Sequence, residues 1–342
     1  MTIVECDASH AAAWDAYVAA CPTASLYHLW AWHGVNLEEF GHRTYAFAAF
    51  ENSRIVGVYP VTQLRTWLFG RLGCSMPFVN YGGPASDSPE VDAALLAEGE
   101  RMAIRDRLKS LEVRSIRLLP GGYPSSSHKV SLTVDVPADP DVMWKAFDTA
   151  HRKGIRKATK VGFESKQGGR ELLRDFYAVL EESWHALGTP FYDFRYFERL
   201  FDVLGDRLSI TAVYLGDEVA AAAMHGVFGE TGEGLWLGTR EKFRRDYVGY
   251  VLYWEILRRA SLAGVRVFHL GRSTADSGAE AFKKKWNAYP KPLFWYYCGL
   301  QGRPMPALNV NNPKYRRAIE LWRRLPLTIT RKIGPPIARG IP

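Results

Sequence analysis

One segment, Gly234 to Trp286, constrains the fold more than any other part of this chain. An apolar strand is predicted to end at Gly238-Thr239-Arg240, and a basic loop and a long helix follow it. A second predicted strand leads to Leu270-Gly271-Arg272-Ser273, ahead of Phe282-Lys283-Lys284-Lys285-Trp286. A strand, a cationic loop and a helix N-terminus in this order present backbone N–H groups and positive charge, an arrangement that binds phosphorylated ligands.

The composition is that of a globular protein large enough for two domains. Hydrophobic residues make up 47% and charged residues 23% of the 342 positions, which argues against disorder. The four cysteines have neither CxxC nor Cys/His spacing, so we expect no metal site and a reducing, cytoplasmic environment. The N-terminus lacks the features of a signal peptide, and the longest stretch without charged side chains, Ala16 to Leu37, is too polar to span a bilayer.

The positive charge is concentrated near the C-terminus. The formal net charge is +8, and residues 311–342 carry eight Lys or Arg against Glu320 alone, a net +7. Residues 1–310 are therefore nearly neutral, so the net charge gives no reason to expect a nucleic-acid-binding body.

A basic helix is predicted in this C-terminal tail. It begins at Asn312-Pro313 and ends before Pro326, with Ile319 and Trp322 on one face and arginines elsewhere. Two interpretations remain open. The helix lies on an anionic membrane surface, at the inner face of the cytoplasmic membrane, or it docks by its apolar face on the protein's own body.

The rest of the chain repeats one plan: helices, an antiparallel run of strands, and a strand–helix–strand crossover. This plan predicts an α+β fold with two tandem domains. The predicted ranges are 1–130 for the N-terminal domain, 131–305 for the C-terminal domain with the donor site, and 306–342 for the basic tail. The stretch 121–127, rich in Gly, Ser and Pro, is part of the predicted link.

Four predicted elements bear on the site and on the link. A single helix is expected over residues 140–160, and the crossover helix over 249–263. Strands are expected over 115–119 and over 267–270.

Several short motifs occur in order along the whole chain: Ser75-Met76-Pro77-Phe78, Tyr81-Gly82-Gly83-Pro84, Arg152-Lys153-Gly154-Ile155-Arg156-Lys157-Ala158, and a closing pattern of Leu270-Gly271-Arg272-Ser273, Gly278, Phe282-Lys283, Trp286 and Pro292-Leu293. Together they resemble FemAB-type acyltransferases of the Gcn5-related N-acetyltransferase (GNAT) superfamily. The closing pattern is similar to a FemAB-related branch found beside exopolysaccharide and PEP-CTERM/exosortase gene clusters.

The resemblance implies two GNAT-like domains, each a mainly antiparallel sheet with a crossover, and no permanently bound cofactor. It also implies transfer of an aminoacyl group from charged tRNA, or of an acyl group from acetyl-CoA or another acyl-CoA, to an amine of a cell-envelope or exopolysaccharide precursor. Better-known relatives extend the peptide of the peptidoglycan precursor. Two alternatives stay open: acetyl-CoA-dependent acetylation of an exopolysaccharide sugar, and a non-catalytic descendant that binds envelope polymer or membrane.

Lys283 is the predicted catalytic residue. Aminolysis passes through a tetrahedral oxyanion, so the site needs a cation or donor aimed at that oxygen and a base for the amine proton. Lys283 follows Phe282, whose ring is expected to hold the ammonium by a cation–π contact, and the pair resembles the Phe-Lys pair of FemAB-type enzymes. The alternative is that Lys283 to Lys285 form a solvated helix face. Asp246 and Asp276 are the nearest carboxylates, and Asp246 is the predicted base, provided that burial raises its pKa.

The acyl donor is expected at the basic loop and the start of the long helix, where phosphates meet arginines and free N–H groups. Acetyl-CoA-using relatives wrap the pyrophosphate here with a glycine-rich pattern, which this chain approximates only with Arg245 and Gly249, one residue too far apart. The alternative is an ordinary surface loop. The predicted donor-binding residues are Arg240, Arg244, Arg245, Tyr247, Gly249 and Tyr250.

The acceptor is expected near the end of the second strand, because ligand crevices commonly lie at the carboxyl ends of such strands. A gap between the strands at Leu235 and Val267 would favour a donor that carries pantetheine, and a continuous sheet would count against it. The predicted acceptor-binding residues are Arg272, Ser273, Phe282, Tyr81 and His28.

Overall fold

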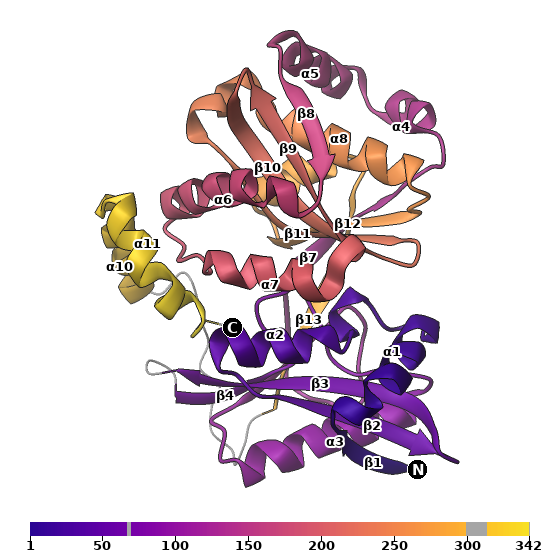
Figure 1. The fold of residues 1–342 in the computed structure, drawn as a ribbon. Helices are drawn as coiled ribbons and strands as arrows, with labels where there is room; N and C mark the ends of the chain where they lie inside the picture. The colour runs from indigo at the N-terminus through magenta and orange to yellow at the C-terminus, as the bar shows by residue number, and fades with distance from the viewer. Residues whose placement is uncertain (67–69, 299–312, 342) are drawn as a thin grey trace. The chain divides into compact units, whose positions relative to one another are not determined.

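The computed structural model describes residues 1–66, 70–298 and 313–341 (Figure 1). The chain divides into two units. Unit 1 comprises Met1–Ser131, Lys291–Ala307 and Arg339–Pro342, and unit 2 comprises Leu132–Pro290 and Leu308–Ala338. The domain ranges expected from the sequence stay predictions.

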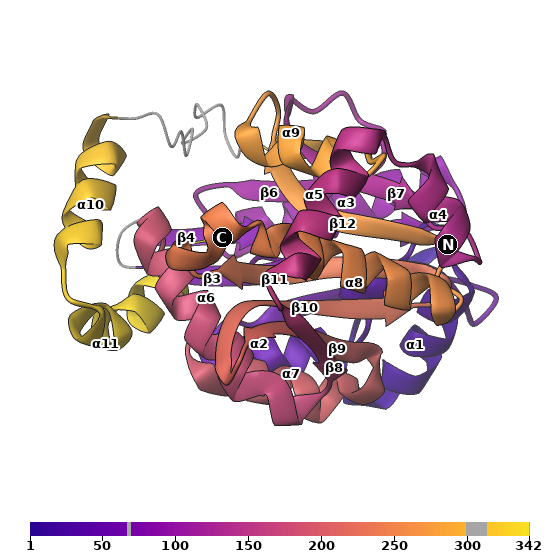
Figure 2. The same ribbon diagram turned by 90° about the horizontal axis from the view of Figure 1, so that it is seen from above.

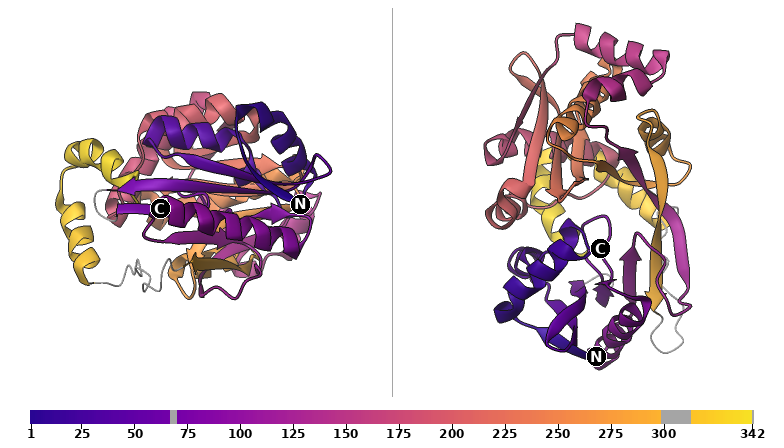
Figure 3. Two further views of the ribbon diagram at one scale, coloured as in Figure 1. Left: turned by 90° about the horizontal axis from the view of Figure 1, so that it is seen from below. Right: turned by 90° about the vertical axis from the view of Figure 1, so that its right-hand side faces the viewer.

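Unit 1 is a mixed sheet with helices on both faces. Its strands run in the order β1-β2-β3-β4-β6-β13, and β5 pairs with β3. Figure 3 shows α3 across one face of these strands, and Figure 1 shows α1 and α2 on the other. The elements are β1 (Thr2–Cys6), α1 (Ala11–Ala20), α2 (Ala31–Phe40), β2 (Thr44–Glu51), β3 (Arg54–Thr66), β4 (Gly70–Cys74), β5 (Ala85–Ser86), α3 (Pro89–Arg105) and β6 (Leu111–Ser115), with parts of β7 (Ser125–Asp135) and β13 (Tyr289–Cys298).

Unit 2 has the same plan, with strand order β7-β12-β11-β10-β9-β8. Helices α6 and α7 cover one face of its strands and α8 covers the other (Figures 1 and 2). The elements are α4 (Pro140–Ala146), α5 (Thr149–Lys160), β8 (Glu164–Gly168), α6 (Leu173–Leu187), α7 (Phe194–Leu204), β9 (Leu208–Leu215), β10 (Glu218–Phe228), β11 (Thr231–Thr239), α8 (Val248–Leu262), β12 (Val267–Thr274), α9 (Gly278–Lys284), α10 (Pro313–Arg324) and α11 (Leu327–Ala338).

The α+β class predicted from the sequence is confirmed. Each unit joins its antiparallel strands to a further strand through a helical crossover, α3 in unit 1 and α8 in unit 2, so that β4 and β6 are parallel, as are β11 and β12. The crossover helix predicted at 249–263 is α8, because its long apolar pattern is a strong signal for a helix packed on a sheet.

The helix predicted over 140–160 is wrong in one respect, because it is two helices. Phe147 is extended, with ψ 147°, and ends α4. The Asp148 carboxylate then caps α5 by accepting from the backbone N–H of His151 at 2.6 Å.

Two strand predictions are also corrected. The strand expected at 115–119 is β6, Leu111–Ser115, since Leu111 and Val113 alternate into the unit 1 core. The strand expected at 267–270 continues to Thr274, so Arg272 and Ser273 lie within β12 rather than after it.

The C-terminal tail docks on unit 2. Trp322 is 7% exposed, the Arg323 guanidinium donates to the Leu187 carbonyl at 3.0 Å, and Arg331 forms a two-bond ion pair with Glu181 of α6. Of the two interpretations of the apolar face, docking on the protein's own body is therefore confirmed. α11 lies beyond the predicted helix end, and the expected helix start at Asn312 falls outside the described residues.

Two further observations concern the chain as a whole. No helix in the described parts of the chain is long and apolar enough to cross a membrane. The four cysteines are buried free thiols.

Candidate active site

The parallel pairing of β11 and β12 is short. It covers three register pairs, from Thr231 opposite Val267 to Glu233 opposite His269. β11 then continues to Thr239 and β12 to Thr274, without further register pairs between these two fully described strands. The register pairs therefore end at Glu233 and His269. Val267, on one side of the expected gap, is still paired with Thr231, so the gap for a pantetheine-bearing donor stays a prediction.

Two glycines lie just beyond the last register pairs of β11 and β12, where the two backbones stay close. Gly271 has a φ of +79°, and a Cβ on it would come within 2.9 Å of the Gly234 carbonyl oxygen. A Cβ on Gly234 would lie 3.1 Å from the carbonyl oxygen of His269. A side chain at either position would push the two backbones apart, so glycine is required for this close approach.

Lys283 of α9 is buried beside β12. Its ammonium donates to the carbonyl oxygens of Gly271 at 2.9 Å and of Arg272 at 3.3 Å, and the residue is 7% exposed. Burial, and then the charge of Arg272, lowers the pKa of Lys283 from 10.5 to about 8. An amine with such a pKa can exchange protons near neutral pH, which suits an acid–base group.

The solvated-face interpretation is wrong for Lys283 and describes its neighbour. The Lys284 side chain is 49% exposed and pairs with Glu280 at 2.8 Å, one turn earlier on α9. Successive helical residues point about 100° apart, so one lysine faces the interior while the next faces solvent.

Phe282 does not hold the Lys283 ammonium. Its ring packs edge-on against Tyr250 and Tyr253 of α8, with centroids 5.4 and 5.3 Å away, and against Trp286 at 6.4 Å. The cation–π contacts between described residues do not include this pair. Phe282 instead joins α9 to the first turns of α8.

The N-terminus of α8 has an unusual backbone. Tyr247, the residue before the helix, has a φ of +64°, and its side chain makes no capping hydrogen bond. A left-handed tyrosine is strained, and such strain is concentrated at ligand sites. The Tyr247 ring packs on Tyr250 at 5.6 Å and under the Lys157 ammonium at 4.6 Å. The positive end of the helix dipole and the Lys157 ammonium therefore lie at the same end of α8.

The three predicted phosphate-binding arginines differ in their surroundings. Arg240 is 16% exposed and bridges Glu182 at 2.9 Å and Glu218 at 2.8 Å, so its charge is neutralised by two carboxylates. Arg244 is exposed and donates to the Thr239 hydroxyl at 3.3 Å, and Arg245 is exposed. The structure favours Arg244 and Arg245 over Arg240 for an anionic ligand.

The remaining predicted residues of unit 2 have distinct settings. Asp246 is half-buried in the turn before Tyr247. Ser273 is 5% exposed, and its hydroxyl has no hydrogen-bond partner among the described residues. Arg272 offers its carbonyl to Lys283. The contacts of the described residues do not join Asp246 to Lys283, so its role as the base stays a prediction.

Tyr81 and His28 belong to unit 1. Tyr81 is 4% exposed and packs edge-on against Tyr27 at 5.0 Å. His28 is 2% exposed, with its ring nitrogens 3.0 Å from the Ser25 hydroxyl and 3.1 Å from the Gly83 carbonyl, and burial lowers its pKa to about 4. Both are core residues of unit 1, and their role in acceptor binding stays a prediction.

The sequence reasoning missed α5 as part of the site. Its His151 is 3% exposed and lies edge-on to Trp286 at 4.4 Å, and burial lowers the pKa of its imidazole. A Cβ on Gly154 would meet the Tyr250 ring at 2.9 Å, so glycine lets α5 approach α8. The sequence identifies the basic run in α5 only as part of the family resemblance, because no local signal indicates that it packs on α8.

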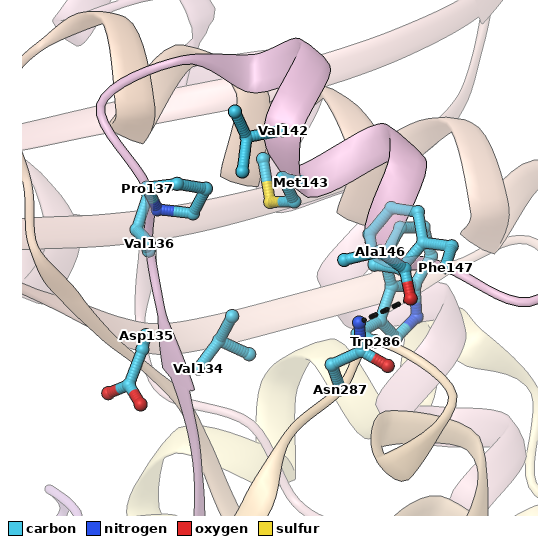
Figure 4. A pocket seen from close by; sticks show the side chains of 10 residues that line it. All are labelled: Val134, Asp135, Val136, Pro137, Val142, Met143, Ala146, Phe147, Trp286 and Asn287. Atoms are coloured by element: carbon cyan, nitrogen blue, oxygen red, sulfur yellow. Dashed lines mark hydrogen bonds between the residues drawn. The ribbon is translucent and has the colours of Figure 1, made fainter.

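A mostly apolar hollow of about 340 Å³ lies on the other side of Trp286 (Figure 4). Its walls come from the end of β7, from α4 and from the turn after α9. Asn287 fixes that turn by donating to the Ala146 carbonyl at 3.2 Å, the dashed line in Figure 4. The indole N–H of Trp286 has no hydrogen-bond partner among the described residues.

The described residues contain no cluster of three or more His, Cys, Asp or Glu side chains able to hold a metal ion.

Comparison with known proteins defines the class. Residues 145–284 match the family described as the acetyltransferase (GNAT) domain. The matched range contains β11, β12, α8 and Lys283. The chain therefore contains a GNAT-type acetyltransferase domain, and the protein is an acyltransferase.

Solved structures share the fold over nearly the whole chain. The crystal structure of FemX has a TM-score of 0.66 at 16% identity, covering 87% of this chain and 98% of FemX. L-PGS from Bacillus licheniformis has a TM-score of 0.57 at 13% identity, covering 94% and 98%. A tandem GNAT protein from the clavulanic acid biosynthesis pathway has a TM-score of 0.51 at 12% identity, covering 89% and 99%. No curated protein matches significantly. The tandem GNAT architecture expected from the FemAB resemblance is confirmed.

Proposed function

We propose that this protein transfers an acyl group from a pantetheine thioester such as acetyl-CoA to an amine of a cell-envelope or exopolysaccharide precursor. The observation that carries the proposal is the end of the β11–β12 ladder at Glu233 and His269. An extended chain with amide groups can pair with strand edges that have separated, as a peptide adds to a sheet edge. The exposed cations at the start of α8 would then meet the phosphates.

Lys283 is proposed as the catalytic group. The attacking amine forms a C–N bond to the thioester carbonyl, and the resulting oxyanion is stabilised by the nearby ammonium. When the C–S bond breaks, the thiolate takes up a proton, for which a lysine with a pKa of about 8 is a suitable donor. Asp246 is proposed to accept the proton of the amine.

Aminoacyl-tRNA remains the rival donor, and α5 is the observation that favours it. Its twelve residues carry five Lys or Arg and no acid, and Lys157 reaches the start of α8 through Tyr247. A helix with this charge suits a chain of phosphates better than it suits a single pyrophosphate.

Labelled acetyl-CoA and labelled aminoacyl-tRNA, each offered separately with extracted envelope material, distinguish the donors. We expect label from acetyl-CoA to appear in the extract, and Lys283→Ala to abolish this transfer while Lys284→Ala does not. Transfer from aminoacyl-tRNA alone would contradict the thioester proposal. Absence of transfer from either donor would contradict both donor proposals.

The acceptor class rests on the resemblance to FemAB-type proteins beside exopolysaccharide and PEP-CTERM/exosortase clusters. An amine-bearing sugar or peptide of such a precursor would supply the nucleophile. Hydrolysis of the labelled product to an N-acyl sugar or N-acyl peptide identifies the acceptor, and an O-acyl ester would contradict the assignment to an amine.

We propose that the protein is located peripherally on the membrane, which it contacts through its C-terminal tail. The outward face of α10 and α11 exposes Leu321 at 63%, Ile329 at 43% and Ile333 at 39%, among arginines and Lys332. Such a face suits an anionic bilayer. Less of the Leu321→Glu variant than of the wild type should sediment with vesicles that contain phosphatidylglycerol. If as much wild-type protein sediments with neutral vesicles as with these anionic ones, the proposal is contradicted.

A further inference from the structure

A cationic hollow lies in unit 1 where the strands extend beyond the end of α3. Under the helix, β2 and β3 present Tyr45 and Val61 to the core, and these residues are opposite one another. Two residues further along β3, the same face carries Gln63 and then Arg65. The core face of the sheet therefore turns from apolar to cationic at a hollow of about 470 Å³.

Four arginines line this hollow, which we call the arginine groove: Arg43 just before β2, Arg65 of β3, Arg71 of β4 and Arg105 at the end of α3. Glu5 and Asp106 are its only acidic lining residues, so the lining carries a net charge of +2. This hollow is distinct from β11, β12 and Lys283, which belong to unit 2.

Two of the arginines have their charge compensated. Arg43 pairs with Glu5 at 2.5 Å, and Arg105 pairs with Asp106 at 3.0 Å. Both guanidinium groups also lie over the Tyr45 ring, at 4.4 and 5.8 Å from its centroid. They are therefore held in place at one side of the groove.

The other two arginines face each other. Arg65 and Arg71 are directly opposite in the antiparallel register of β3 and β4. Like charges in this position repel, and ion pairs among the described residues do not include either one. A bound anion between the two guanidinium groups would convert this repulsion into two attractive contacts.

A buried donor points to the same ligand. Gln63 lines the groove and is 2% exposed, and its amide nitrogen has no hydrogen-bond partner within the described parts of the chain. Buried amide donors are nearly always satisfied, so an unsatisfied one at the base of a cationic hollow indicates a missing acceptor. An oxyanion supplies that acceptor.

We propose that the arginine groove binds a phosphoryl dianion, either a diphosphate or a phosphate monoester, between Arg65 and Arg71 with the Gln63 amide donating to one of its oxygens. Guanidinium forks match phosphate oxygens bidentately. Two facing arginines that form no ion pair among the described residues suit a ligand with two negative charges, which a phosphoryl group supplies and a single carboxylate does not.

The probe is inorganic pyrophosphate, titrated at low salt into the full-length protein by calorimetry and by thermal unfolding. At ten times its dissociation constant, pyrophosphate is expected to raise the unfolding midpoint of the wild type by about 2 °C. Arg65→Gln and Arg71→Gln should each weaken binding at least about tenfold, by loss of a charged hydrogen bond. Arg101→Gln is the matched control, since this exposed arginine of α3 pairs with Glu98 outside the groove.

The effect of Arg65→Gln on the unfolding temperature should change sign when pyrophosphate is added, which makes the test specific. Without anion, Arg65→Gln should unfold at the same temperature as the wild type or a higher one, because it removes the repulsion, and with saturating pyrophosphate it should unfold at a lower one. The proposal is overturned if pyrophosphate leaves the wild type unchanged, if Arg65→Gln binds as tightly as the wild type, or if succinate binds more tightly than pyrophosphate.

Discussion

Replacing Lys283 by methionine should separate the catalytic role of this residue from its effect on stability. Methionine keeps the length and apolar stem of lysine and removes the ammonium. The variant loses the donor of two hydrogen bonds, to the Gly271 and Arg272 carbonyls, and it also loses the cost of burying a charge in a site that is 7% exposed.

The sign of the pH dependence follows from the lowered pKa of Lys283. Below pH 8 the amine is charged in the folded and the unfolded state, and above pH 10.5 it is neutral in both. Between these values the unfolded state keeps a proton that the folded state has released, so the unfolding free energy of the wild type rises with pH relative to the variant. At about 1.4 kcal/mol per pH unit, the gain over the window is about 3 kcal/mol.

At neutral pH, the loss of the two hydrogen bonds and the relief of the burial cost have opposite effects on stability. Two hydrogen bonds from a charged donor are worth about 1.5–3 kcal/mol each. Their loss is opposed by relief of the burial cost, about 3 kcal/mol by the same linkage. We therefore expect Lys283→Met to be at most about 3 kcal/mol less stable than the wild type at pH 7. We expect kcat to fall about 10²–10³-fold through loss of oxyanion stabilisation.

The assay is urea unfolding of wild type and variant from pH 7 to pH 10.5, followed by tryptophan fluorescence, together with acyl-transfer kinetics. Lys284→Met is the control, since Lys284 is 49% exposed and its removal leaves the Lys283 contacts in place. A stability difference that does not change with pH would show that the pKa of Lys283 is ordinary. Full activity in Lys283→Met would remove this residue from the mechanism.

Further substitutions test neighbouring parts of the structure. Gly271→Ala should lower the unfolding free energy by about 1–3 kcal/mol in urea, because of its positive φ and the nearby Gly234 carbonyl, and a loss below about 0.5 kcal/mol would contradict the close approach. Arg244→Ala should raise the KM for the donor about tenfold, whereas Arg240→Ala should act mainly on unfolding, since its charge is already paired; equal KM effects would contradict this distinction. Trp322→Ala should undock the tail and speed its cleavage in limited proteolysis, and an unchanged cleavage rate would argue against docking.

The sequence predicts those elements whose signals are local. The crossover helix α8 follows from a long apolar pattern, and the entry of α4 follows from Asp139-Pro140, whose carboxylate does cap the helix. The sequence predicts a turn at the start of β7, because Ser125 to Lys129 are polar. These residues are extended only through pairing with distant strands.

In the candidate active site, too, some features have a local sequence signal and others depend on distant contacts. The position of Lys283 follows from its motif, but its burial depends on β12 carbonyls eleven and twelve residues away in sequence. The pairing of Arg240 with Glu182 depends on a residue 58 positions away, so the sequence alone presents Arg240 as a free cation. Contacts between distant segments therefore decide which charged residues remain available to a ligand.

The central claim is that the gap between β11 and β12 receives the pantetheine of the donor beside Lys283. The most direct measurement is a crystal structure with a non-hydrolysable thioether analogue of acetyl-CoA. The account predicts pantetheine between the two strands, with the carbonyl oxygen of the analogue within hydrogen-bond reach of the Lys283 ammonium. An analogue bound elsewhere, with the gap closed by direct pairing of β11 and β12, would contradict it.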